Sequence, residues 1–177
     1  MDNYKTLIER VEKVTKEKKL DLSSGEDLSI GIMNLISIEE HLFFSAQKTG
    51  KKEYLDLLDE VRKMRVDLLK EIIKDYEGEV WCISKHLLAA SMRLMEVGTK
   101  ELKKGDKEKA NKMFENSYKL YSLFWGLNLG MTKIANDKLQ MTNEFQMTND
   151  KNNKTKKVSI FSKLNDFVQK ALDCCRE

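Results

Sequence analysis

Two charged side chains, Glu39 and Arg65, stand at positions where the sequence pattern requires apolar ones. At about 100° per residue on a helix, Glu39 falls in the centre of the apolar line of residues 32–46. Arg65 falls inside the apolar line of residues 58–76. An isolated charge in an apolar interior is costly, whereas a carboxylate and a guanidinium can neutralise each other. We therefore expect these two residues to pair if both are buried.

Gly50 lies between Glu39 and Arg65. Glu39 is 11 residues before Gly50, and Arg65 is 15 residues after it. If two helices fold back at Gly50, this offset equals about 6 Å of helical rise, which an arginine side chain can span. We predict that Glu39 and Arg65 meet inside the protein, with Arg62 as the alternative partner. Three interpretations stay open: an ion pair that fixes helix register, the polar floor of a small-ligand or metal site, and exposure at a helix crossing.

A second group, Glu79, Cys82, His86 and Arg93, runs along one flank of residues 79–103 at steps of three, four and seven. Cysteine and histidine one turn apart can share a divalent transition metal. A zinc site needs about four ligands, so His41, Glu40 or an acidic residue of another helix would have to complete it. The alternative is that Cys82 is packed and that His86 makes one hydrogen bond at the edge of the core.

Five of the glycines fall at nearly even intervals in a chain without proline, which indicates the helices that position these residues. Glycine readily closes a helix in the left-handed conformation, and proline breaks helices. Helices of about 20–25 residues that are joined by tight turns pack side by side. The sequence therefore predicts an all-α fold, an antiparallel bundle of about five helices. Ser23 and Asp106 are the expected N-caps of the second and fifth helices. The helices are expected at residues 4–18, 24–48, 52–76, 79–103 and 107–128, and the glycines are Gly25, Gly50, Gly78, Gly105 and Gly130.

The composition changes after Gly130 and again near Val158. Residues 131–157 are polar and carry a near-duplicated hexamer, which indicates a flexible linker between a bundle domain at 1–130 and the last segment. In residues 158–177 the helical period returns, so we expect an amphipathic C-terminal helix. It can dock on its own bundle, pair with a second protein or lie on a membrane, but its balanced polar face argues against the membrane. Its candidate partner-binding residues are Ile160, Leu164, Phe167 and Val168.

The chain between Val97 and Tyr121 resembles a tetratricopeptide repeat. The residues at that family's relative spacings are Gly98, Gly105, Asp106, Ala110, Phe114 and Ser117. The resemblance implies a helical hairpin of the kind that stacks into peptide-binding solenoids. About three or more repeats are normally needed, and the sequence holds no second copy. The resemblance therefore implies a single hairpin and favours protein binding.

The composition narrows the class of protein. The net charge of +3 comes from the linker, and arginine is scarce, so recognition of duplex nucleic acid is not expected. Three cysteines, two of them adjacent, form no disulfide framework, which favours the reducing cytoplasm. The sequence has no signal-peptide pattern after Met1, and no apolar run reaches the roughly 18 residues of a membrane span.

The sequence contains no Gly-rich phosphate loop, nucleophile elbow or dinucleotide fingerprint. We therefore expect a non-enzymatic cytoplasmic protein without a cofactor, which acts through protein–protein interaction or self-association. The alternative is a helical bundle that binds a divalent transition metal or a small molecule in an interhelical site. That site would be built from Glu39, Arg65, Cys82 and His86.

Overall fold

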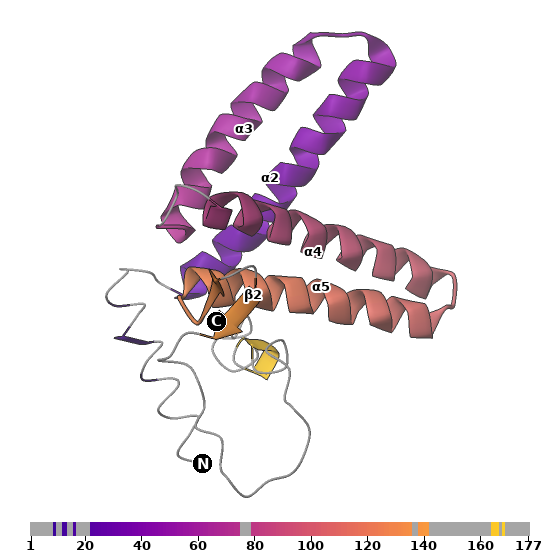
Figure 1. Ribbon diagram of the computed structural model, residues 1–177. Coiled ribbons are helices and arrows are strands. Elements are labelled where there is room, and N and C mark those ends of the chain that lie inside the picture. Colours follow the sequence, from indigo (N-terminus) through magenta and orange to yellow (C-terminus); the bar gives the residue numbers. More distant parts are fainter. Residues whose placement is uncertain are drawn as a thin grey trace, which may run out of the picture.

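The computed structural model of the protein describes residues 22–74, 79–135 and 138–141, with residues 9, 12, 13, 16, 164–166 and 168 nearer the ends (Figure 1). The helices are α2 (Leu22–Thr49), α3 (Glu53–Ile72), α4 (Glu79–Lys103) and α5 (Lys107–Asn128). Two short strands follow, β1 (Thr132–Ala135) and β2 (Lys138–Met141). The all-α fold class predicted from the sequence is confirmed.

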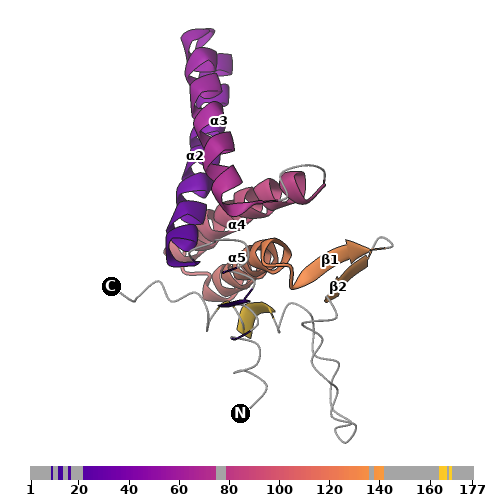
Figure 2. The same ribbon diagram turned by 90° about the vertical axis from the view of Figure 1, so that its left-hand side faces the viewer.

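The four helices form two antiparallel hairpins, α2–α3 and α4–α5, which cross steeply (Figure 1, Figure 2). In Figure 2 the α2–α3 hairpin stands upright, with α4 and α5 at its foot. The predicted helical bundle is confirmed, but its two hairpins cross instead of lying side by side. Ile32 and Met33 explain the crossing, because both are buried although neighbouring residues lie about 100° apart on a helix. This part of α2 must face both α3 and the second hairpin.

Three of the glycines close helices as expected. Gly50, Gly105 and Gly130 have φ of 69°, 87° and 72°, a conformation that strains residues with a Cβ atom. At the end of α4, the Gly105 N–H donates to Leu102 O at 3.0 Å and the Asp106 N–H donates to Glu101 O at 3.1 Å. These are the two bonds of the Schellman motif. The Asp106 side chain then caps α5 by accepting from the Lys109 N–H at 3.0 Å.

Gly25 does not end a helix. It is the fourth residue of α2 and is buried there, and Ser23, the expected N-cap, also lies inside α2. A glycine inside a helix costs only about 1 kcal/mol relative to alanine, which tertiary packing can offset. Gly78 and most of the predicted helix 4–18 lie outside the described residues. The described members of that predicted helix are helical and exposed: Glu9, Glu12, Lys13 and Lys16.

The face of α4 that packs on α5 carries small residues at intervals of seven. Ser84, Ser91 and Gly98 are all buried, and the facing line of α5 has the same interval at Ala110, Ser117 and Phe124. Seven residues are close to two helical turns of about 3.6 residues each. Two lines of equal period stay in contact along the length of both helices when the helices coil slightly around each other.

Polar groups in the seam, the contact between α4 and α5, form hydrogen bonds with one another. Ser91 Oγ donates to Ser117 O at 2.9 Å, and Ser117 Oγ donates to Ser91 O at 2.7 Å. Asn128 Nδ2 donates to Ser84 Oγ at 2.9 Å. These reciprocal bonds avoid the cost of buried unpaired hydroxyl groups and fix the register of the hairpin.

The main core lies where the two hairpins cross. Phe124 and Trp125 of α5 are fully buried, with ring centroids 5.2 Å apart at 79°, an edge-to-face arrangement. Tyr121 packs against both rings. The other buried apolar residues of this core are Ile32, Met33, Leu69, Ile72, Ile73, Leu87, Leu88, Leu127, Leu129, Met131, Leu164 and Val168.

Strands β1 and β2 form a two-stranded antiparallel sheet in the region predicted as the start of the linker. Thr132 pairs with Met141 and Ala135 pairs with Lys138. Two residues, Asn136 and Asp137, separate the last pair in the sequence. Asn and Asp are favoured in two-residue hairpin connections, and the interpretation from composition overlooked this signal. Residues 142–157 lie outside the described residues.

Candidate functional site

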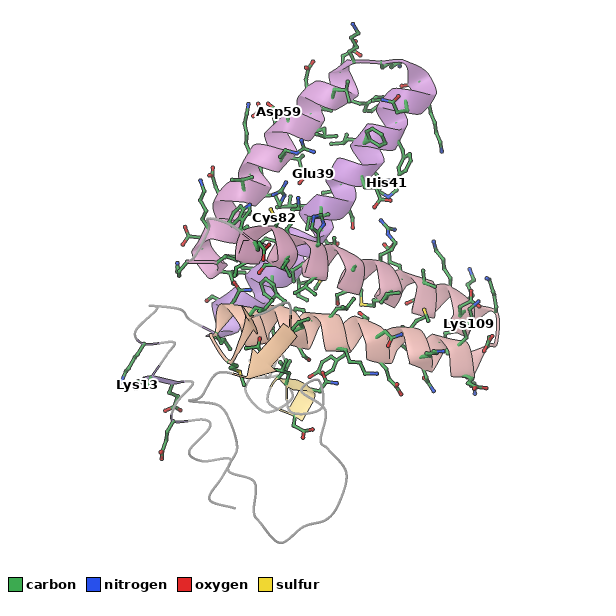
Figure 3. The ribbon with its side chains drawn as sticks, in the orientation of Figure 1. Lys13, Glu39, His41, Asp59, Cys82 and Lys109 are labelled. Carbon is green, nitrogen blue, oxygen red and sulfur yellow. The ribbon has the colours of Figure 1, made fainter. Side chains whose placement is uncertain are left out.

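Glu39 and Arg65 form an ion pair between α2 and α3, and Figure 3 shows Glu39 in the space between these helices. Arg65 Nε lies 2.7 Å from Glu39 Oε1, and Arg65 Nη2 lies 3.2 Å from Glu39 Oε2. Arg62 Nε also donates to Oε2, at 3.0 Å. Glu39 is 8% exposed and Arg65 is 5% exposed. Both arginines named from the sequence therefore bind the same carboxylate, and the pair is buried.

The surroundings of Glu39 decide its charge. Burial alone raises the pKa of this carboxyl, but hydrogen bonds from Arg65 and Arg62 and the charges of both arginines outweigh burial. They hold the pKa of Glu39 below its ordinary value. Glu39 is therefore ionised at neutral pH, and it neutralises one of its two arginines.

A pocket of about 470 Å³ lies beside this ion pair, between α2, α3 and α4. Ile36 and Ala89 supply its apolar wall. Its titratable lining residues are Glu39, Arg62, Arg65, Lys85 and His86. The crossing of the hairpins thus brings α4 to the polar residues of the first hairpin.

The candidate metal ligands do not gather at one point. Within the described ranges, no three side chains of His, Cys, Asp or Glu are placed to share a metal ion. His41 points away from α3 (Figure 3), and Glu79 and Cys82 are exposed on α4. Of the four candidates, His86 is the one that lines the pocket. Its neighbours there are cations, so this lining suits an anion better than a metal ion.

Arg93, which the sequence places on the same helix as His86, binds elsewhere. Its guanidinium donates to Glu40 of α2 and to Glu96 of its own helix. This contact ties α4 to α2 and neutralises the carboxylate next to Glu39 in the sequence. Sequence reasoning missed Lys85 as a pocket residue, because a lysine at the edge of an amphipathic helix is ordinary.

Two of the candidate partner-binding residues of the C-terminal segment pack inside the protein. Leu164 and Val168 are 0% and 1% exposed and belong to the core at the crossing. A Cβ atom on Gly126 of α5 would lie 2.7 Å from Leu164 Cδ2, so Leu164 sits directly on this glycine. These two residues therefore pack on their own chain. Ile160 and Phe167 lie outside the described residues.

The arm, defined here as residues 38–64, comprises the C-terminal part of α2 and the N-terminal part of α3. Its base contacts α4 through Glu40, and its tip projects away from α4 (Figure 1). Within the arm only Glu39 and Ala46 are buried. The rings of Phe43 and Phe44 contact each other edge to face, with centroids 5.3 Å apart. In a hairpin of two helices, each helix buries only the face that contacts the other helix. Apolar side chains on the remaining faces are therefore exposed to solvent. Those between 41% and 55% exposed are Ile38, Phe43, Phe44, Leu55, Leu57 and Met64.

Comparisons of this chain with protein-family models, with curated proteins and with solved structures give no match. None of the helices in the described ranges is both long and apolar enough to cross a membrane.

Proposed function

We propose that this protein is a non-enzymatic, cytoplasmic interaction protein that binds through the arm, and that the partner is a second copy of the chain. The observation that carries this proposal is the exposure of six large apolar side chains on the arm, three of which, Ile38, Leu57 and Met64, lie on one flank. An exposed apolar patch on a folded protein often marks an interaction site.

Three of these side chains share one flank of the arm. On a helical wheel, Ile38 lies about 90° from the inner face of α2, and Leu57 and Met64 lie about as far from the inner face of α3, on the same side. The ion pair between Glu39 and Arg65 sets the register, so Ile38 and Met64 stand at nearly the same level. Together the three residues form a stripe on the flank opposite the pocket.

Two copies of the arm can cover each other's stripes. A twofold axis places the same patch of both copies in one self-complementary interface. Two hairpins packed in this way form a four-helix bundle, the usual means by which antiparallel helix pairs bury a second face.

The resemblance of residues 97–121 to a tetratricopeptide repeat agrees with a role in protein binding, because such repeats are binding modules. The cytoplasmic location agrees with the free, exposed thiol of Cys82.

The molar mass of the full chain in solution tests the proposal. Light scattering coupled to gel filtration, over about a hundredfold range of concentration, should give twice the 20.6 kDa of one chain. The double variant Leu57→Gln, Met64→Gln should give the mass of one chain with an unchanged helical circular dichroism spectrum. The control is Leu102→Gln, which changes another exposed leucine, outside the arm, and should remain dimeric.

A native chain that stays monomeric throughout this range contradicts self-association. A dimer that survives the double variant contradicts the arm as its interface. A monomeric native chain whose purified complex with a different protein is broken by the double variant keeps the arm as a binding surface and overturns the choice of partner.

A further inference from the structure

The pocket between α2, α3 and α4 carries unbalanced positive charge. Arg62, Arg65 and Lys85 each contribute one positive charge to its lining, and Glu39 contributes one negative charge. Leaving His86 aside, the lining has a net charge of two positive units. Arg65 is buried and paired with Glu39, whereas Arg62 is exposed and Lys85 is half-buried. A concentration of accessible positive charge in a concave site attracts anions.

The acidic residues around the pocket are already engaged. Glu40 of α2 binds Arg93, and Asp59 of α3 lies 2.9 Å from Lys63 Nζ. Neither belongs to the lining of the pocket. Among the described residues, then, Glu39 is the one carboxylate that faces its cations.

Hydrogen-bond donors remain at the pocket after these pairs are formed. Arg62 donates to Glu39 through Nε, and a guanidinium has five N–H groups in all. The side chain of Arg62 is 55% exposed, so its terminal nitrogens are accessible. Lys85 and His86 show no hydrogen bond or ion pair to any described residue. The donors come from two different helices and converge on one space of about 470 Å³.

We propose that this pocket binds a small molecule through a doubly charged phosphate group. A phosphate monoester carries the two negative charges that the lining lacks, and its oxygens can accept from several directions at once. Arg62 supplies a planar, multiply donating contact, Lys85 supplies a point charge, and His86 supplies a further N–H. The hydrogen bonds from Arg65 hold the Glu39 carboxylate in place. Glu39 in turn positions Arg62, which binds the same carboxylate, at the rim of the pocket. This binding role goes beyond the proposed self-association, which uses the opposite flank of the arm.

Amide chemical-shift mapping of the full ¹⁵N-labelled chain tests this proposal. Inorganic phosphate and methyl phosphate are titrated at low ionic strength, with succinate as a dianion of different shape. Both phosphate compounds should give saturable shifts centred on Ile36, Arg62, Lys85, His86 and Ala89. Lys85→Gln should weaken the binding of methyl phosphate by about tenfold or more, since one charge-assisted hydrogen bond is lost.

The matched control is Lys103→Gln, which removes an exposed lysine at the other end of the same helix. It should leave the affinity within about twofold. Equal weakening by the two variants would show nonspecific attraction and overturn the site. Absence of saturable shifts with either phosphate compound would also overturn it. Saturable binding of succinate without binding of phosphate would overturn the assigned chemistry. The molar mass of the Lys85→Gln chain stays that of the native chain, so the outcome is separate from that of the self-association test.

Discussion

Glu39 accepts hydrogen bonds from two arginines, but only one of them is buried. The Arg65 side chain is 6% exposed and the Arg62 side chain is 55% exposed. Water can therefore solvate Arg62 when Glu39 is removed, whereas Arg65 depends on Glu39 for its counter-charge. The two arginines make different contributions although both touch the same carboxylate.

The first prediction concerns this difference. Glu39→Leu leaves the Arg65 guanidinium buried and unpaired, so we expect the free energy of unfolding to fall by about 3–5 kcal/mol. The double variant Glu39→Leu, Arg65→Leu removes both charges and should be within about 1 kcal/mol of the native chain. Urea denaturation measures both values. The control Glu60→Gln breaks a surface pair with Lys63 and should change stability by less than about 0.5 kcal/mol. A harmless Glu39→Leu would mean that the pair is not buried in solution.

The second prediction concerns pH. Because the pKa of Glu39 is lowered in the folded protein, its ionisation stabilises the fold. This contribution is complete well above the ordinary carboxyl pKa of about 4.3 and is lost as the pH falls through the lower folded-state value. Between about pH 6 and about pH 3, the native chain should lose more stability than Glu39→Gln. Urea midpoints for the two chains across this range provide the measurement, and parallel curves would refute the expectation.

The sequence was sufficient to pair Glu39 with Arg65, because their distances from one turn can be counted along two helices of known rise. The same reasoning could not find Lys85. Its place in the pocket depends on the angle at which α4 crosses the first hairpin, and no local pattern encodes that angle.

Among the elements, α4 and α5 are packed most closely at Gly98. A Cβ atom at this position would lie 2.6 Å from Phe114 Cε1 and 3.2 Å from Met113 Cβ. Phe114 belongs to the opposite helix, and its ring is rigid. The hairpin therefore requires a residue without a side chain at this level of the seam.

The third prediction compares two glycines inside helices. Gly98→Ala should lower the free energy of unfolding by about 1–3 kcal/mol, because overpacking exceeds the gain in helix propensity. Gly31→Ala on α2 should raise it by about 0.5–1 kcal/mol, since nothing lies within 4 Å of the added atom. Thermal and urea unfolding of both variants test the contrast. If both changes stabilise the protein, α4 and α5 are less closely packed than described here.

Helix ends were largely predictable from glycine. Gly50, Gly105 and Gly130 need the left-handed conformation, and few other residues adopt it readily. Gly25 matches the spacing of the others but lies buried inside α2. Spacing alone cannot separate a glycine that ends a helix from one that is buried inside a helix.

At the scale of the whole molecule, burial is uneven. The crossing holds the main core, while the arm buries only Glu39 and Ala46. The sequence predicts helices of similar length, but it does not predict that one hairpin projects from the core. The apolar faces of α2 and α3 are compatible with packing inside a common bundle and also with a projecting hairpin. The choice depends on contacts between hairpins that are distant in the sequence.

The fourth prediction follows from this uneven burial. Local opening is easier where few apolar contacts are lost, so amides of the arm should exchange with deuterium faster than those of α4 and α5 in dilute protein. Mass spectrometry of peptic fragments measures the exchange. If two arms pack together, protection of the arm should rise with protein concentration while that of α5 stays constant. Equal protection of both hairpins in dilute protein would contradict the prediction.

The seven-residue spacing of Ser84, Ser91 and Gly98 against Ala110, Ser117 and Phe124 has a consequence for engineering. Matched insertions in the middle of both helices preserve these facing lines when they turn each helix by nearly whole turns, as about seven or about eleven residues do. Insertions of about five or about nine residues turn the helix by about half a turn and bring bulky residues into the space that serine and glycine now leave open. Libraries of length variants should therefore recover folded proteins at the first two lengths far more often than at the other two.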